Sequence, residues 1–240
     1  RLTREHPDFV PGHNTLADLR WEYGPGPGSD EDPLQPFIAA ADAAPRNHEL
    51  QLGLIGFLLE ARRWTDALDR LQALRRAVEH PALVAMEANT LEAMGRTDEA
   101  ALRYVEADRS LGEHDIAFVN AYVRHLLRRG RADEAATRAL RALELAPDHQ
   151  ETWAYLATAW RLTGDPREHW LCGYHRLIEL MPVDVPQGWP DMASFLADLI
   201  AALEPLHRAR TEPVRQSLRQ GSQTPGRLFG REDPRIAGLE

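Results

Sequence analysis

The side chains best suited to chemistry are few in this chain of 240 residues, and they stand apart from one another. All 28 basic residues other than histidine are arginine, so no lysine can form a Schiff base or hold a phosphate in a P-loop. The single cysteine, Cys172, excludes an intrachain disulfide and a cysteine-based zinc site. Because Trp170, Leu171 and Tyr174 flank it, we expect a buried, inert thiol rather than a reactive one.

The histidines are scattered singly along the chain and do not predict a metal site. His6-Pro7-Asp8 matches the H-x-D motif of an iron-binding triad. Such a triad needs a strand that holds both side chains on one side, and Pro7 within the motif argues against a strand here. His169 and His175 are spaced so that they fall on different faces of a helix. We therefore predict structural or exposed histidines, and no catalytic, cofactor-binding or metal-binding residue in this chain.

Asparagine and arginine side chains form a third group, which could bind a ligand without chemistry. Asn hydrogen-bonds a peptide backbone, and Arg holds a carboxylate through two parallel hydrogen bonds. These residues share a surface only if the chain folds into repeated helical pairs whose first helices line one concave face. A solvated helix face is the alternative interpretation. The candidates, called here the A-face residues, are Asn89, Glu92, Asn120, Arg124, Leu127, Arg128 and Arg161.

A repeat of 34 residues supplies the helices that would position this group. Units that begin at Ile116 and Gln150 both carry glycine at position 15, namely Gly130 and Gly164. Large apolar residues predict the seam of the first helix, small residues in the second helix allow close approach, glycine turns the chain and proline ends the pair. The residues that carry this pattern are Ala135, Ala142, Pro147, Trp153, Leu156, Ala157 and Trp160.

This pattern resembles that of tetratricopeptide-repeat (TPR) proteins, in which each repeat is a helical pair. The resemblance predicts an all-α, TPR-like superhelical solenoid of about five helical hairpins over residues 12–182. An entry segment (1–11), a linker and helix (183–207) and an irregular tail (208–240) complete the expected organisation. We also expect Trp153, Trp160 and Trp170 to pack between helices rather than form an aromatic cage.

Individual helix boundaries follow from local signals. The first helix is expected over 14–23, capped by Asn14 or Thr15, and the second over 33–44. Paired helices are then expected in 48–80, 81–115, 116–149 and 150–182. After three prolines in 181–190, Asp191 is expected to cap a helix that runs to about residue 207.

The tail carries a second resemblance. Residues 213–229 read PVRQSLRQGSQTPGRLF, and Asp233-Pro234-Arg235-Ile236 follows. This is similar to the opening of a family of 2-oxoglutarate/Fe(II) oxygenases, where Q-S-L-R-G-G-T-Q-T-x-G-x-L-F precedes D-P-x-I. Residues 172–177 and 188–207 also look like the join between repeats and oxygenase. The chain departs from the phrase at Gln220, Ser222 and Pro225.

The oxygenase resemblance implies a longer protein that uses Fe(II) and 2-oxoglutarate. The family's β-helix with its H-x-D…H iron triad is absent from this sequence, so we expect this chain to be the N-terminal part of that protein and to need no cofactor itself. Residues that would line the entrance of an oxygenase pocket are Arg215, Ser217, Arg219, Gln223 and Thr224.

Charge and hydropathy restrict the partners. Nucleic-acid binding needs a basic face, and the net charge of −9 argues against it. No apolar run is long enough to cross a bilayer, so we expect a cytoplasmic protein without a membrane partner. The sequence thus predicts a non-catalytic scaffold that binds a peptide or protein partner, with homo-oligomer formation left open. The alternative is an oxygenase, a hydroxylase whose repeats present a protein or peptide substrate.

Overall fold

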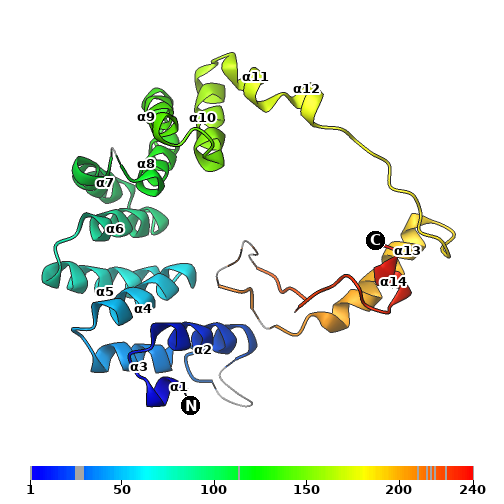
Figure 1. The fold of residues 1–240 in the computed structure, drawn as a ribbon, viewed down its shortest axis with the longest axis horizontal. Helices are drawn as coiled ribbons and strands as arrows, with labels where there is room; N and C mark the ends of the chain where they lie inside the picture. Colours follow the sequence, from blue (N-terminus) through cyan, green and yellow to red (C-terminus); the bar gives the residue numbers. More distant parts are fainter. Residues whose placement is uncertain are drawn as a thin grey trace. The chain divides into compact units, whose positions relative to one another are not determined.

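The computed structural model describes residues 2–24, 30–112, 114–209, 211–214, 216, 218, 220–224 and 226–239. In these residues all regular structure is helical, and no strand occurs. The chain divides into two units (Figure 1). The terminal unit contains Arg1–Ala61 and Met181–Glu240, and the central unit contains Arg62–Leu180. The all-α class predicted from composition and periodicity is therefore confirmed.

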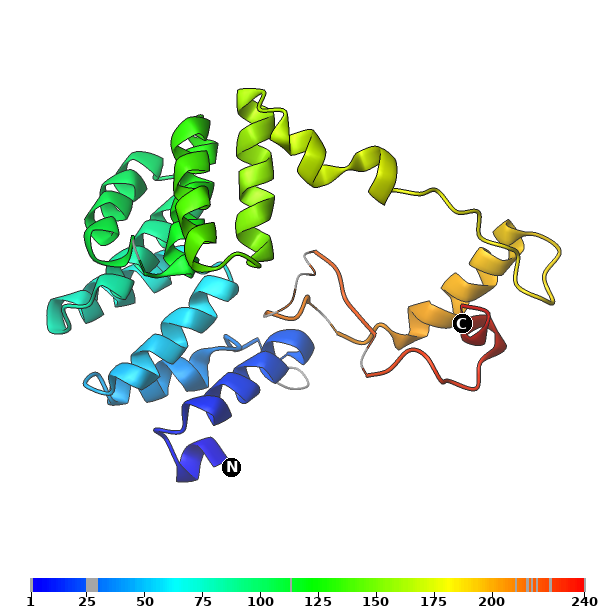
Figure 2. The same cartoon turned by 45° about the horizontal axis from the view of Figure 1, so that its top comes forward.

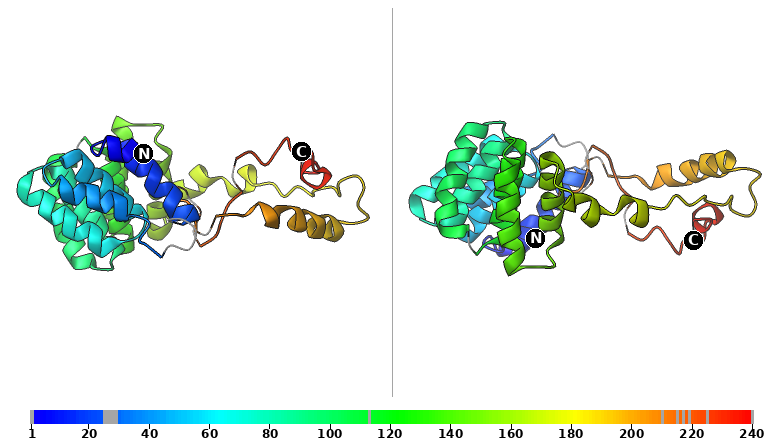
Figure 3. Two further views of the ribbon diagram at one scale, coloured as in Figure 1. Left: turned by 90° about the horizontal axis from the view of Figure 1, so that it is seen from below. Right: turned by 90° about the horizontal axis from the view of Figure 1, so that it is seen from above.

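The central unit is a row of helices in which each lies beside its neighbour in sequence, as Figures 2 and 3 show. Small residues make this close approach possible, because Ala100, Ala107, Ala135 and Ala142 are all buried. Tyr104 fills the space between them and is fully buried. The helices are α5 (Trp64–Ala77), α6 (Pro81–Ala93), α7 (Thr97–Leu111), α8 (Ile116–Arg128), α9 (Ala132–Leu145) and α10 (Gln150–Thr163).

Glycines end the first helix of each pair in the central unit. Gly95, Gly130 and Gly164 have φ angles of +77°, +72° and +73°. This left-handed conformation suits glycine because a side chain there would strain the backbone. The predicted turns at position 15 of each repeat are confirmed.

The second helices α5, α7 and α9 each start with an ion pair instead of a side-chain cap. In α9, Arg131 just before the helix binds Glu134 with an Nε–Oε1 distance of 2.7 Å. The same i,i+3 pairing joins Arg96 to Glu99 at 2.7 Å before α7. Glu134 and Glu99 thus lie near the positive end of the helix dipole and also anchor the turn that precedes each helix.

The last hairpin departs from the pattern. Its second helix is broken into α11 (Arg167–Cys172) and α12 (Tyr174–Leu177) by Gly173, whose φ is +48°. Because of this break, Trp170 is 69% exposed and Cys172 is only half-buried. The expectations of a packed Trp170 and a buried Cys172 were wrong, whereas Trp160 is buried as predicted.

The terminal unit has its own small core. Leu34, Phe37, Leu50 and Leu54 are fully or almost fully buried, and His13 stacks on Phe37 with ring centroids 5.1 Å apart. The helices of its first segment are α1 (Leu2–Glu5), α2 (Val10–Tyr23), α3 (Gln35–Ala43) and α4 (His48–Glu60).

The start of α2 corrects the sequence prediction. The helix begins at Val10 rather than Asn14, with Phe9 at the N-cap and no side-chain cap. Pro11 lies in the first turn, where its missing N–H costs nothing. Thr15 is inside the helix and donates its hydroxyl to the Pro11 carbonyl at 3.0 Å. Proline therefore starts this helix, and neither Asn14 nor Thr15 caps it.

The second segment of the terminal unit contains α13 (Met192–Leu203), a 3-10 turn (Glu204–Leu206) and α14 (Pro234–Ala237). Asp191 caps α13 as predicted, with Oδ1 2.8 Å from the Ser194 nitrogen. Phe195, Leu199 and Ile236 bury one another, which packs α14 against α13.

Candidate functional site

The A-face residues lie on α6, α8 and α10 of the central unit, but the structure gives them unequal exposure. Asn120 and Glu92 are 2% and 8% exposed. Asn89, Arg124 and Leu127 are half-buried, whereas Arg128 and Arg161 are exposed. Leu127 packs against the hydrophobic core. The group therefore contains both interior links and surface residues.

Asn120 joins two neighbouring repeats. Its Oδ1 accepts a hydrogen bond from the Thr152 hydroxyl at 2.9 Å, and its Nδ2 lies 3.3 Å from Nδ1 of His149. The same His149 nitrogen accepts from the backbone of Thr152 at the start of α10. Since these partners belong to α10 and its N-cap, the Asn120 amide fixes α10 against α8.

Glu92 forms the equivalent link between α6 and α8. Its carboxylate lies 2.6 Å from Nδ1 of His125 and 3.1 Å from Nη1 of Arg128. The Glu92 and His125 side chains are almost completely buried, whereas the Arg128 side chain is 58% exposed. Two of the predicted residues, Glu92 and Arg128, thus contact each other.

Arg124 differs from the other arginines of the A face. Its Nη2 donates to Oδ1 of Asn89 at 3.3 Å, and its buried Nε has no hydrogen-bond acceptor. No described carboxylate lies within ion-pair distance of it. The Tyr104 hydroxyl also donates to Asn89, at 2.8 Å. Burial, followed by the nearby charge of Glu92, raises the pKa of Tyr104.

Arg161 of α10 contacts the broken second helix of the last hairpin. It donates to Oε1 of Glu168 at 2.7 Å, and the same oxygen accepts from the Tyr174 hydroxyl at 2.7 Å. Arg161 also contacts that hydroxyl directly. The hydrogen bond from Arg161, followed by that from Tyr174, lowers the pKa of Glu168. Arg161 therefore connects α10 to both α11 and α12.

Of the five predicted tail residues, only Gln223 and Thr224 belong to the described part of the chain. Arg215, Ser217 and Arg219 lie outside the described residues. Gln223 and Thr224 are half-buried and form no side-chain hydrogen bond with the described part of the chain.

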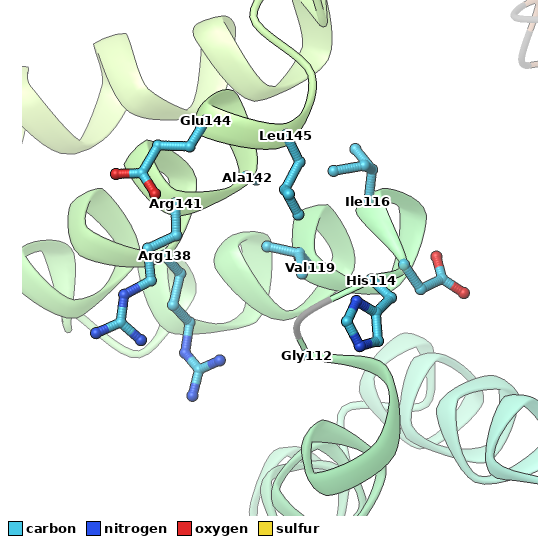
Figure 4. A pocket seen from close by; sticks show the side chains of 10 residues that line it. Gly112, His114, Ile116, Val119, Arg138, Arg141, Ala142, Glu144 and Leu145 are labelled. Carbon is cyan, nitrogen blue, oxygen red and sulfur yellow. The ribbon is translucent and has the colours of Figure 1, made fainter.

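Sequence reasoning missed a hollow between α9 and the α7–α8 turn (Figure 4). Its volume is about 360 Å³. The only sequence signal was the spacing of Arg138, Arg141 and Leu145, which places them on one side of α9. The residues that line it are Gly112, His114, Asp115, Ile116, Val119, Arg138, Arg141, Ala142, Glu144 and Leu145.

Metal-binding and membrane-spanning features are absent from the part of the chain that the structure describes. The described residues contain no group of three or more His, Cys, Asp or Glu side chains that could hold a metal ion. His6 and Asp8 are part of that described region. No described helix is both long enough and apolar enough to span a membrane.

Comparison with known proteins adds no argument to the fold described above. No family model matches the chain, and no curated protein matches it. A solved structure described as "Crystal structure of YrrB: a TPR protein with an unusual peptide-binding site" is 16% identical, with a TM-score of 0.47. The match covers 70% of this chain and 84% of that chain. A TM-score at this level carries no argument about function.

The class of the protein follows from its own helices. Paired helices with glycine turns, small residues at the contact and a regular repeat define a TPR-like, all-α helical-repeat fold. Such a fold presents surfaces and does not by itself imply an activity.

Proposed function

We propose that this chain is a repeat scaffold that binds an acidic, extended peptide segment of a partner protein along α6, α8 and α10, at the A-face side chains that are not buried: Asn89, Arg124, Arg128 and Arg161. The observation that carries the proposal is Arg124, a half-buried guanidinium without a carboxylate partner among the described residues. Arg128 and Arg161 are exposed on the same set of helices, but each is already paired with a glutamate, Glu92 or Glu168, so they only border the site.

The energetics favour an anionic ligand. The Arg124 guanidinium is half-buried and has no carboxylate within ion-pair distance among the described residues, so its positive charge is incompletely balanced. Its hydrogen-bond partner Asn89 is neutral, and the carboxylate of Glu92 acts on it only from beyond ion-pair distance. A peptide carboxylate at Arg124 would supply the missing counter-ion, while the Asn89 amide could bind the peptide backbone.

Charge reversal tests this proposal. We expect the double substitution Arg124→Glu and Arg161→Glu to abolish binding of a fluorescein-labelled peptide of alternating Glu and Ser, measured by anisotropy at low salt. Arg76→Glu with Arg109→Glu is the matched control, because both arginines are exposed and have no described ion-pair partner. The Arg124→Gln variant, which keeps a hydrogen-bond donor for Asn89, separates loss of charge from loss of fold.

Two results would overturn the proposal. One is unchanged affinity in the charge-reversed protein with its helical circular dichroism intact. The other is equal binding of a Gln-Ser version of the peptide, because a neutral ligand cannot form an ion pair with the Arg124 guanidinium.

A second candidate function is that of a 2-oxoglutarate/Fe(II) oxygenase whose repeats present a protein or peptide substrate. The phrase at 213–229, with Asp233-Pro234-Arg235-Ile236 after it, supports this candidate. The described residues do not fit an iron site, so no catalytic step is assigned to them. Succinate release with Fe(II) and 2-oxoglutarate should be measured for any longer form of the protein and for this chain, and we expect none from this chain.

A further inference from the structure

The hollow beside α9 has an apolar floor that is open to a ligand. Ile116 and Val119 come from the start of α8, and Ala142 and Leu145 come from the end of α9. Leu145 is 62% exposed although it points to this floor (Figure 4). Burying one apolar side chain of a partner here would remove exposed apolar surface on both molecules.

Two arginines stand beside the floor, and they differ in availability. Arg138 is held by Asp108 through two hydrogen bonds of 2.6 and 2.7 Å. Its guanidinium also lies 4.4 Å from the centre of the Tyr122 ring. Arg141, one turn further along α9, is exposed and has no hydrogen-bond or ion-pair partner among the described residues. Arg138 is thus already neutralised, whereas Arg141 can accept a carboxylate.

A second hollow continues along α9 towards its N-terminus. Its volume is about 300 Å³, and it shares Arg138 and Arg141 with the first hollow. Asp133, Glu134 and Thr137 complete its lining. Glu134 is bound by Arg131, but the Asp133 carboxylate has no described partner. This end of the groove therefore favours a positive group.

We propose that the two hollows form one docking groove, the α9 groove, for an extended segment of a partner protein. The segment places an apolar side chain on the floor at Leu145, a carboxylate on Arg141 and a basic side chain at Asp133. The order of these three groups follows the order of their receptors along the helix, whichever way the bound chain runs.

Helix geometry sets the spacing of the motif. At about 1.5 Å per residue, α9 advances about 18 Å from Asp133 to Leu145 and about 6 Å from Arg141 to Leu145. An extended peptide advances about 3.3 Å per residue. The acidic residue is therefore expected about two positions from the apolar residue, and the basic residue about five positions from it.

This site does not depend on the A-face proposal. Its ligand contacts come from α9 and the start of α8, and none of the A-face residues lines either hollow. The expected ligands also differ. The α9 groove would bind an apolar, an acidic and a basic side chain in that order, whereas the A face would bind a negatively charged group.

A display selection with random linear peptides, performed on the complete chain, tests the groove. We expect enriched peptides to carry the apolar, acidic and basic residues at the stated spacing. Synthetic versions should bind at least tenfold more weakly to Arg141→Glu and to Leu145→Asp. Matched controls are Arg109→Glu and Leu102→Asp, which alter an exposed arginine and an exposed leucine of α7 that line neither hollow.

Each outcome decides the question. Tenfold losses confined to the two groove variants support the inference, and a further loss in Asp133→Asn for peptides with the basic residue supports the assigned order. Absence of enriched peptides, enrichment of a different pattern, or equal losses in the α7 controls would overturn it.

Discussion

At the scale of single residues, the repeats of the central unit are joined by buried polar contacts. Asn120 binds Thr152, and Glu92 binds His125. Glu87 is also buried and contacts both Arg75 of α5 and Arg103 of α7. Such groups are costly to bury alone and stable only when every partner is present. They therefore specify which helix lies against which, in addition to the less specific apolar contacts.

The Asn120 link predicts a measurable loss of stability. Asn120→Ala removes one of the two hydrogen-bond partners of the buried Thr152 hydroxyl, because Nδ1 of His149 also lies 2.9 Å from it. We expect the free energy of unfolding to fall by about 0.5–1.5 kcal/mol, the usual net contribution of one hydrogen bond. Urea unfolding followed by circular dichroism measures it, with Ser110→Ala, an exposed change in α7, as the control. Equal stability of the two variants would show that Asn120 does not join the repeats.

Glu168 predicts a dependence on pH. Its pKa is below the ordinary value of 4.5, chiefly because Arg161 donates to it. A lowered folded-state pKa stabilises the fold at pH values above 4.5, and that contribution is lost as the pH falls through the folded-state pKa. The stability difference between the natural protein and Glu168→Gln should therefore shrink on acidification. Urea titrations across an acidic pH series check this, and a difference independent of pH would contradict it.

At the scale of elements, the hairpin pattern was predictable because it depends on residue type and spacing. Ala100, Ala135 and Gly130 occupy the positions that close helix contact and a left-handed turn require. The start of α2 was predicted less well, since Pro11 competed with two good capping residues. The break at Gly173 was not predicted from the sequence, because the bulky residues around it are of types that also occur inside helices.

Two glycines give opposite predictions that test the role of the turn. Gly130 has a φ of +72° and no atom near an added Cβ, so alanine there should destabilise the protein by conformation alone, by about 1–2 kcal/mol. Gly56 lies inside α4, also with free space around it, so alanine there should stabilise by about 0.5–1 kcal/mol. Thermal unfolding of both variants gives the signs. Destabilisation by Gly56→Ala, or none by Gly130→Ala, would contradict the assignment of these glycines.

At the scale of the whole molecule, the sequence predicts a repeat protein better than it predicts a ligand. The A-face residues were found by counting helix positions, but counting could not show that Asn120 and Glu92 point into the contact between repeats. It could not find the α9 groove either, because that groove combines residues of two helices and a turn. Surfaces of this kind depend on packing between repeats, which no local pattern contains. The domain boundaries and the oxygenase resemblance of the tail stay predictions.

Hydrogen–deuterium exchange with the alternating Glu-Ser peptide tests the central claim, that the first helices of the repeats bind an acidic segment. The account predicts slower exchange in α6, α8 and α10 when the peptide is added, and no such change in Arg124→Gln. Protection outside these helices, or the same protection in Arg124→Gln, would contradict it.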